Sequence, residues 1–466
     1  MYFVLILALI IISFIALVVF KWEIMCPPVI VCLMFTFTSF FGLFTYDDFN
    51  YSEFSIRSTV FILMGILSFF TGSWFVYLYY CKKYSLNEKE IIEIKRKRLE
   101  PGIVYNLTAF GLEMVTLIWA FVYMRGMVVS RGYSIATITL IIQRYHIFSQ
   151  YLNDVNEPVL LGAMINYSAV FGIISLFIFI HNKCFQCSEK KDFIHIIIAF
   201  LWLSISVLRS NRGNLLIFLS ALMYFLFIFW KMYDGWKLDV DKKICKTAII
   251  MAILFIVLFI FLMVFMGRHK SLADINIMRY LSTYISCPIR NFDLFLKDSL
   301  LKTQNIGSET FYSIYRSFYR LLGYGDSFTR HLEFRSINGL NTGNIYTAFR
   351  RFYSDFGMTG MIVLSSIQGM IFTMGYMHNK KNAYRMKLGF GLLLYGYLSY
   401  TVFYLPIDDV LYSSVLSIGT PIRILVMYLL YYYVTKIKLK LANKCQAIFE
   451  KNWIVKKGNF NKHHSR

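Results

Sequence analysis

The segment TAIIMAILFIVLFIFLMVFM, residues 247–266, decides the fold class, because it runs for 20 residues without a charged side chain. A run of about 20 apolar residues is long enough to cross the hydrocarbon core of a bilayer as an α-helix. Similar runs recur along the chain, which has 466 residues and is 58% hydrophobic and 18% aromatic. A soluble protein cannot bury that much apolar surface. The sequence therefore predicts an all-α, polytopic integral membrane protein.

The apolar runs predict eleven membrane spans joined mostly by short loops. The first run follows Met1 directly, with no basic segment before it, which favours a span over a cleavable signal peptide. The predicted spans cover residues 2–20, 24–44, 58–80, 102–123, 158–180, 193–208, 213–230, 247–266, 356–377, 388–405 and 420–435.

One long segment, residues 267–355, is not apolar enough to lie in the membrane, and it divides the chain into four parts. Residues 1–266 form eight predicted spans, 267–355 a long loop, 356–435 three further spans, and 436–466 a basic tail. Within the long loop, 309–322 and 289–301 have the spacing of amphipathic helices, which we expect to lie along the membrane interface. Residues 323–344, rich in Gly, Ser, Asn and Thr, are interpreted as irregular loop.

The basic residues predict the orientation of the chain. Loops rich in Lys and Arg stay in the cytoplasm, and residues 81–101 carry seven of them. Alternation then places the N-terminus and the segment 267–355 outside and the tail inside. The net charge of +22 is dispersed over such loops, so it indicates membrane topology and no nucleic-acid partner.

Arginine and lysine are divided unequally between the two predicted faces. The inner segments carry 25 Lys and 4 Arg, and the outer segments carry 3 Lys and 16 Arg. Topology requires only positive charge, so it does not explain this division. The guanidinium group grips phosphate or carboxylate with two parallel hydrogen bonds, which indicates an anionic ligand at the outer face. The alternative is that the outer arginines pair with outer carboxylates.

Two features place charge at a depth where it is costly. The predicted sixth span is short and ends in Arg209-Ser210-Asn211-Arg212-Gly213, which puts two arginines at or below the outer membrane surface. The alternative is a simple turn whose arginines extend to the interface. Glu113 lies inside the fourth span. It either lines a cavity or pairs with a buried arginine, or it is a hydrogen-bonded structural carboxyl.

Two short motifs are given a structural interpretation. Asp239-Val240-Asp241 has the DxD pattern of enzymes that use nucleotide sugars, but it lies in a short predicted inner loop beside two lysines and is read as a solvated loop. Cys184 and Cys187 form a single CxxC, which without a second pair is a weak sign of zinc or redox chemistry.

Two stretches resemble a known family. The hairpin 209–213, and the exit of the long loop through Asn344-Ile345-Tyr346-Thr347 and 353–360, are similar to Wzy-type repeat-unit polymerases, which build O-antigen, capsule and related bacterial polysaccharides. The topology resembles that family over nearly the whole chain. The specific motif content is confined to the two stretches.

The resemblance implies a glycosyltransferase of the bacterial plasma membrane with a GT-C-like helical architecture. A polyprenyl-diphosphate-linked glycan would be the donor, a lipid-linked repeat unit the acceptor, and a chain-length co-polymerase a possible partner. The chemistry requires a charged leaving group to be stabilised and a proton to be taken from the acceptor hydroxyl. No tight carboxylate cluster is evident in the outer loops, so we expect no metal and no cofactor.

The expected site combines a base with diphosphate-binding arginines. The base candidates are Asp355 and His331, and His269 and the Asp408-Asp409 pair are further outer candidates. For Asp355 the alternative is a carboxylate that stabilises a helix N-terminus. The arginines expected to bind the diphosphate are Arg209, Arg212, Arg268, Arg279, Arg290, Arg350 and Arg351.

Two rival functions fit the same sequence. An O-antigen-type ligase would transfer the glycan to a different acceptor. A flippase or transporter of lipid-linked oligosaccharides would move it across the membrane, but such proteins are built from repeats, and no internal repeat is evident here.

Overall fold

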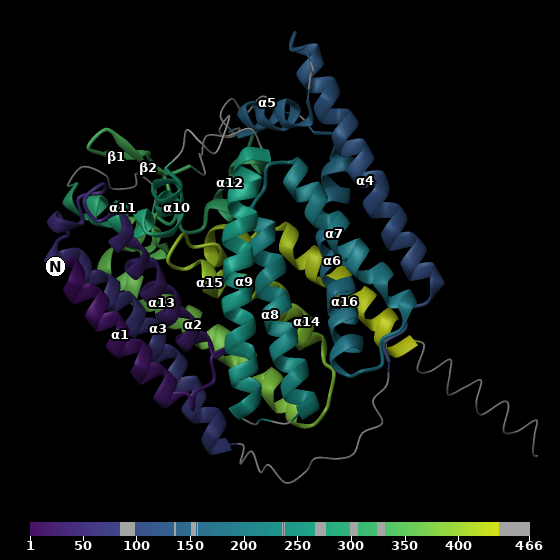
Figure 1. Ribbon diagram of the computed structural model, residues 1–466, viewed down its shortest axis with the longest axis horizontal. Helices are drawn as coiled ribbons and strands as arrows, with labels where there is room; N and C mark the ends of the chain where they lie inside the picture. The colour runs from purple at the N-terminus through teal and green to yellow at the C-terminus, as the bar shows by residue number, and fades with distance from the viewer. Residues whose placement is uncertain are drawn as a thin grey trace, which may run out of the picture.

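The computed structural model describes residues 1–83, 98–134, 137–150, 155, 157–234, 236, 238–265, 276–298, 306–323 and 331–437. These residues are mostly helical, and the only strands among them form one short hairpin (Figure 1). Nine helices in this part of the chain are long and apolar enough to cross a membrane. The predicted fold class is thus confirmed at the level of a helical chain compatible with a polytopic membrane protein.

The long helices follow the predicted spans closely. They are α1 (Tyr2–Val19), α2 (Pro27–Phe41), α3 (Ile56–Lys83), α4 (Ile103–Ser130), α6 (Val159–Cys184), α7 (Phe193–Leu208), α8 (Gly213–Asp234), α9 (Leu238–Phe265), α13 (Ala348–Tyr384) and α16 (Gly419–Tyr432). In the predicted tenth span two shorter helices, α14 (Phe390–Leu398) and α15 (Tyr400–Tyr404), follow one another. Single turns of 3-10 or π-helix are η1 (Gly42–Thr45), η2 (Tyr51–Glu53), η3 (Lys190–Asp192), η4 (Leu411–Val415) and η5 (Tyr433–Ile437).

The tightest helix pair is α3 with α13, which come from opposite ends of the chain (Figure 1). Small residues allow their backbones to touch, as is common between membrane helices. A Cβ added at Gly72 would lie 2.2 Å from the carbonyl oxygen of Ser366, and one added at Gly369 would lie 2.2 Å from that of Phe69. The other large group of contacts joins α6 to α7 and α8, and α4 to α7 and α6.

The start of α13 differs from the predicted ninth span. The helix begins at Ala348, eight residues before the predicted boundary at 356. Gly357 interrupts it with φ +64° and ψ −160°, a conformation that is readily available only to glycine. The kink separates a first short helical stretch, residues 348–356, which carries Arg350, Arg351 and Asp355, from the apolar helix that follows.

The described residues of 276–347 form a folded layer over one end of the bundle, which we call the cap (Figure 1). It contains α10 (Ile277–Ile285), α11 (Cys287–Lys297), α12 (Tyr312–Leu321), β1 (Arg335–Ile337) and β2 (Leu340–Gly343). Both predicted amphipathic helices are present. In α11, Ile289 and Phe292 are fully buried and the helix packs against α3. Its position along a membrane interface stays a prediction.

The interpretation of residues 323–344 as irregular loop was wrong for its second half. Strands β1 and β2 pair antiparallel across Asn338-Gly339, which both have positive φ, at 52° and 75°. These values are those of the tight hairpin turn that Asn-Gly favours. The signal was in the sequence, because Ile337 and Leu340 flank the Asn-Gly pair.

Two more features were not expected. Helix α4 continues to Ser130, and a further helix, α5 (Ile138–Gln150), lies across the capped end of the bundle (Figure 1). At the opposite end, Asp241 of the DxD-like motif is not in a solvated loop. It lies in the first turn of α9, is 9% exposed and forms an ion pair of 2.6 Å with Lys231. Burial between α8 and α9 explains the residue without nucleotide-sugar binding.

Candidate functional site

The turn between α7 and α8 holds the first candidate arginines. Arg209 ends α7, Ser210 follows with φ +57°, and the side chain of Asn211 accepts a hydrogen bond of 3.0 Å from the Gly213 N–H at the start of α8. The turn is therefore only four residues long, and it fixes Arg209 and Arg212 at the capped end of two packed helices.

Arg212 is held by aromatic side chains from α9 and α10. Its guanidinium lies 4.7 Å from the ring of Phe259 and 5.9 Å from the ring of Tyr284, and Nη1 donates a 2.5 Å hydrogen bond to the hydroxyl of Tyr280. Aromatic faces attract a guanidinium without neutralising its charge. The sequence did not single out these three rings, because they are separated from Arg212 by 47 or more residues.

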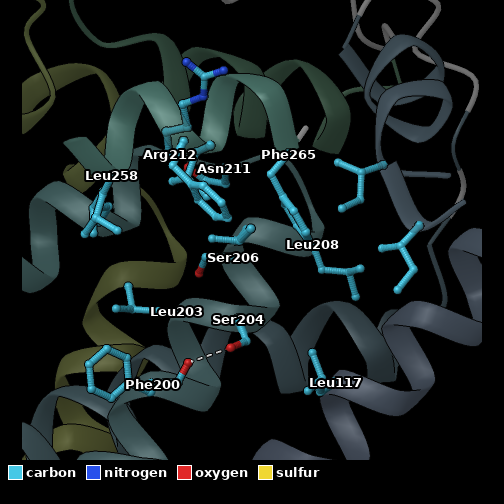
Figure 2. Close-up of a pocket in the computed structure, with 16 residues that line it drawn as sticks. Leu117, Phe200, Leu203, Ser204, Ser206, Leu208, Asn211, Arg212, Leu258 and Phe265 are labelled. Atoms are coloured by element: carbon cyan, nitrogen blue, oxygen red, sulfur yellow. Dashed lines mark hydrogen bonds between the residues drawn. The ribbon is translucent and has the colours of Figure 1, made fainter. Parts of the chain in front are cut away.

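A cavity of about 380 Å³ lies next to this arginine. Helices α4, α5, α7, α8 and α9 line it, and its wall is almost entirely apolar. Figure 2 shows Asn211 and Arg212 at one edge, with the Arg212 guanidinium pointing away from Phe200 and Leu117 at the other end. The residues that line it are Leu117, Ile138, Ile142, Phe200, Leu203, Ser204, Ser206, Val207, Leu208, Asn211, Arg212, Leu215, Leu258, Phe261, Leu262 and Phe265. The arrangement fits an amphiphile whose apolar chain ends in an anion.

Arg209 is neutralised by a carboxylate. Its Nη2 lies 2.5 Å from Oε1 of Glu157, and the hydroxyl of Tyr145 on α5 also donates to that oxygen. The Glu157 carboxylate raises the pKa of Arg209 in spite of burial, which acts in the opposite direction. Through Glu157, Arg209 thereby links the end of α7 to α5.

Arg350 and Arg351 lie in a second cluster, at the start of α13. Arg350 is 3% exposed and forms ion pairs with Glu309 and, at 2.7 Å, with Glu333. Arg351 makes two hydrogen bonds of 2.6 and 3.0 Å to Asp408. Arg350 thus joins α13 to the cap, and Arg351 joins it to the loop before η4.

Two acidic groups of this cluster have raised pKa values. Burial raises the pKa of Glu309, although Arg350 and Arg351 oppose the change. Burial and the neighbouring Asp408 carboxylate raise the pKa of Asp409 to about 7. The Asp409 oxygens also accept the backbone N–H groups of Leu411, Tyr412 and Ser413, at 3.1 to 3.3 Å.

Asp355, the predicted base, lies beside the same cluster. It is 8% exposed, and its two oxygens accept the backbone N–H groups of Thr310 at 2.6 Å and Glu309 at 3.4 Å. It lies two residues before the kink at Gly357, after which the apolar part of α13 begins, so the alternative role at the N-terminus of that helix stays a prediction. Its hydrogen bonds order the turn before α12.

The remaining candidates lie elsewhere in the described part of the chain or outside it. Arg279 pairs with Asp48 at 2.7 Å on the surface. Arg290 is 1% exposed, pairs with Asp293 in α11 and donates to the Phe49 carbonyl. His331 begins the described segment that leads to β1. Arg268 and His269 lie outside the described residues.

The structure therefore distributes the predicted arginines over several places. Arg209 and Arg212 lie together at the cavity, and Arg350 and Arg351 lie together with Asp355. Five arginines have carboxylate partners, which is the alternative that the sequence left open: Arg209, Arg279, Arg290, Arg350 and Arg351. Arg212 is held by aromatic rings and lines the edge of an apolar cavity, so it is the arginine best placed to meet the anionic end of an amphiphile there.

Comparison with known proteins gave no match. No protein-family model fits the sequence, and no curated protein or solved structure is similar to it.

Proposed function

We propose that the protein is a membrane glycosyltransferase that polymerises polyprenyl-diphosphate-linked repeat units at the outer face of a bacterial plasma membrane. The observation that carries the proposal is the apolar cavity of about 380 Å³ with Arg212 at its edge. An isoprenoid chain matches the apolar wall, and a diphosphate matches the guanidinium group. The Arg-rich composition of the predicted outer segments supports the same ligand.

The chemistry proposed for the site is stabilisation of the leaving group. As the glycosidic bond of the donor breaks, negative charge develops on the diphosphate. Arg212 is already oriented by Phe259, Tyr284 and Tyr280, so it needs no reorganisation to meet that charge. The low-dielectric wall of the cavity strengthens the interaction.

The acceptor hydroxyl must lose a proton, and Asp355 is proposed as the base. It belongs to α13, as do Arg350 and Arg351, and its oxygens already accept two backbone N–H groups. Such hydrogen bonds orient a carboxylate, as a base requires, but they also give Asp355 a structural role. Substitution of Asp355 by Asn distinguishes the two roles.

The test is deletion of the gene followed by analysis of surface and lipid-linked glycans. A polymerase predicts that single repeat units remain and long chains disappear. Long chains accumulating on the lipid carrier would identify a ligase, and repeat units trapped on the inner leaflet would identify a flippase.

A further inference from the structure

The bundle contains an acidic side chain in its interior that the proposed function does not use. Glu113 lies ten residues after Ile103 in α4, which places it about 15 Å along the helix axis, near the middle of a span. Its exposure is 0%. Neither carboxylate oxygen has a hydrogen-bond partner among the described residues, and no described cation forms an ion pair with it.

An ionised carboxylate is very costly at this position. Transfer of an isolated charge out of water costs several kcal/mol or more, and a buried group without a partner takes its neutral form instead. The side chain of Thr116, one turn further along α4, donates to the Leu112 carbonyl at 2.6 Å, so it does not supply a proton to Glu113. The carboxyl group must therefore carry its own proton.

Other buried polar atoms without partners lie on the same helices, towards the end opposite the cap. They are Oδ1 of Asn106 in α4 and Nδ1 of His195 in α7. The ring of Tyr105 lies 6.4 Å from that of His195, and its hydroxyl is 3.2 Å from Oγ of Ser175 in α6. Asn106 and Glu113 are seven residues apart, so they face the same side of α4. We call these five residues the polar seam: Tyr105, Asn106, Glu113, Ser175 and His195.

The charged and titratable residues on the packed helices leave Glu113 without a compensating charge. In α6 they are Tyr167, eight residues after the start of the helix, and His181, Lys183 and Cys184 at its other end, and none of them is a described ion-pair partner of Glu113. In α7 the only charged or titratable residue is His195. In α5 these residues are Arg144, Tyr145 and His146, and α5 lies at the end of α4 that is far from Ile103.

We propose that Glu113 is a proton-binding site and that the polar seam connects it with water at the end of the bundle opposite the cap. A hydronium ion delivers the proton to the carboxylate and leaves as water, and release reverses the step. Each unpartnered atom of the seam is then satisfied by exchanging water molecules or by the proton itself. The inference does not depend on the proposed function.

Infrared difference spectroscopy of the full-length protein in lipid vesicles tests the first half of the proposal. The C=O stretch of a protonated carboxyl is well separated from carboxylate bands. At pH 7 we expect such a band in the wild type, its loss in Glu113→Gln and a shift of the band in Glu113→Asp, which keeps the acid. Spectra of the three proteins that are identical in this region would overturn the proposal.

Deuterium exchange tests the second half. Transfer to D2O shifts the Glu113 band at the rate at which the proton exchanges with water. We expect Asn106→Leu and His195→Phe to slow this shift by about tenfold or more. His181→Phe is the matched control, because His181 is a buried histidine of α6 whose Nδ1 is already bonded to Asn182 at 3.1 Å. A band that never shifts in the wild type, or that shifts equally fast in all variants, would contradict the seam.

Discussion

The guanidinium of Arg212 lies 4.7 Å from the ring of Phe259, although the two residues belong to different helices, 47 positions apart in the chain. The contact holds the guanidinium of Arg212 at the edge of an apolar cavity. Arg209, Arg279, Arg290, Arg350 and Arg351 are bound to carboxylates, and the ring contacts and the cavity distinguish Arg212 from them.

We expect Arg212→Ala to reduce polysaccharide synthesis by about 10²- to 10³-fold, the effect of removing one preorganised donor from a developing anion. Arg212→Lys keeps the charge but loses the planar fork, so it should restore activity only in part. Chain length on gels and turnover of lipid-linked substrate provide the measurements.

Arg423→Ala is the matched control for Arg212. Like Arg212, Arg423 donates a hydrogen bond to a tyrosine hydroxyl, that of Tyr397 at 3.0 Å. It lies in α16 and does not line the cavity. Normal chain length in the Arg212 variants, or equal losses in the Arg423 variant, would remove the diphosphate role.

Asp355→Asn separates a base from a structural carboxylate. The amide keeps one oxygen for the N–H groups of residues 309 and 310 but cannot take a proton, so we expect transfer to be lost while the protein still folds. The loss of one hydrogen bond should cost about 1–2 kcal/mol of stability. Thermal unfolding with a transfer assay measures both, and an active but less stable variant would assign Asp355 to structure alone.

Asp409 should make the protein less stable as pH rises through the acidic and neutral range. Its pKa is raised to about 7 in the folded protein, whereas the unfolded carboxyl ionises near 3.8. Between these values the folded state holds more protons than the unfolded state, so stability falls with pH by at most about 1.4 kcal/mol per unit and then levels off. Asp409→Asn should flatten this part of the profile in thermal unfolding, and an unchanged slope would assign the pH dependence to another group.

Gly369→Ala should weaken the contact between α3 and α13. The new Cβ would lie 2.2 Å from the Phe69 carbonyl oxygen, so the helices must separate, at a cost of about 1–3 kcal/mol. Gly111→Ala is the control, because a Cβ there meets nothing within 4 Å. Equal unfolding temperatures for the two variants would show that the close approach is not required.

We expect transfer activity to persist in EDTA, because the proposed chemistry uses a guanidinium group to stabilise the leaving diphosphate. The assay compares purified protein before and after chelation, with Mg²⁺ and Mn²⁺ added back. Complete loss that either ion restores would replace this proposal with a metal-assisted one.

The sequence predicted the long helices well and the cap poorly. Residues 247–266 have one structural solution, because a run of apolar side chains must be helical to satisfy its backbone in a membrane. The segment 323–344 offered only local signals. The Asn338-Gly339 pair is one such signal and indicates a tight turn. The strands on either side of it have only three and four residues, which is too short for an alternating pattern to be recognised.

The candidate site was predictable in its residue types and not in its partners. The excess of arginine at one predicted face was visible in the sequence, and so was the cost of Glu113. The carboxylate partners of the arginines come from distant parts of the chain. Asp408 is 57 residues from Arg351, Glu309 is 41 residues from Arg350, and Glu157 is 52 residues from Arg209.

By itself, the sequence determined that the chain is a set of apolar helices with most of its arginines in a few connecting segments, because hydrophobicity and charge are properties of single residues. Only the tertiary structure decided that Arg212 faces aromatic rings while Arg351 faces a carboxylate. The reason is that the charge available to a ligand depends on the groups within a few ångströms, and helix packing brings those groups together from distant parts of the chain.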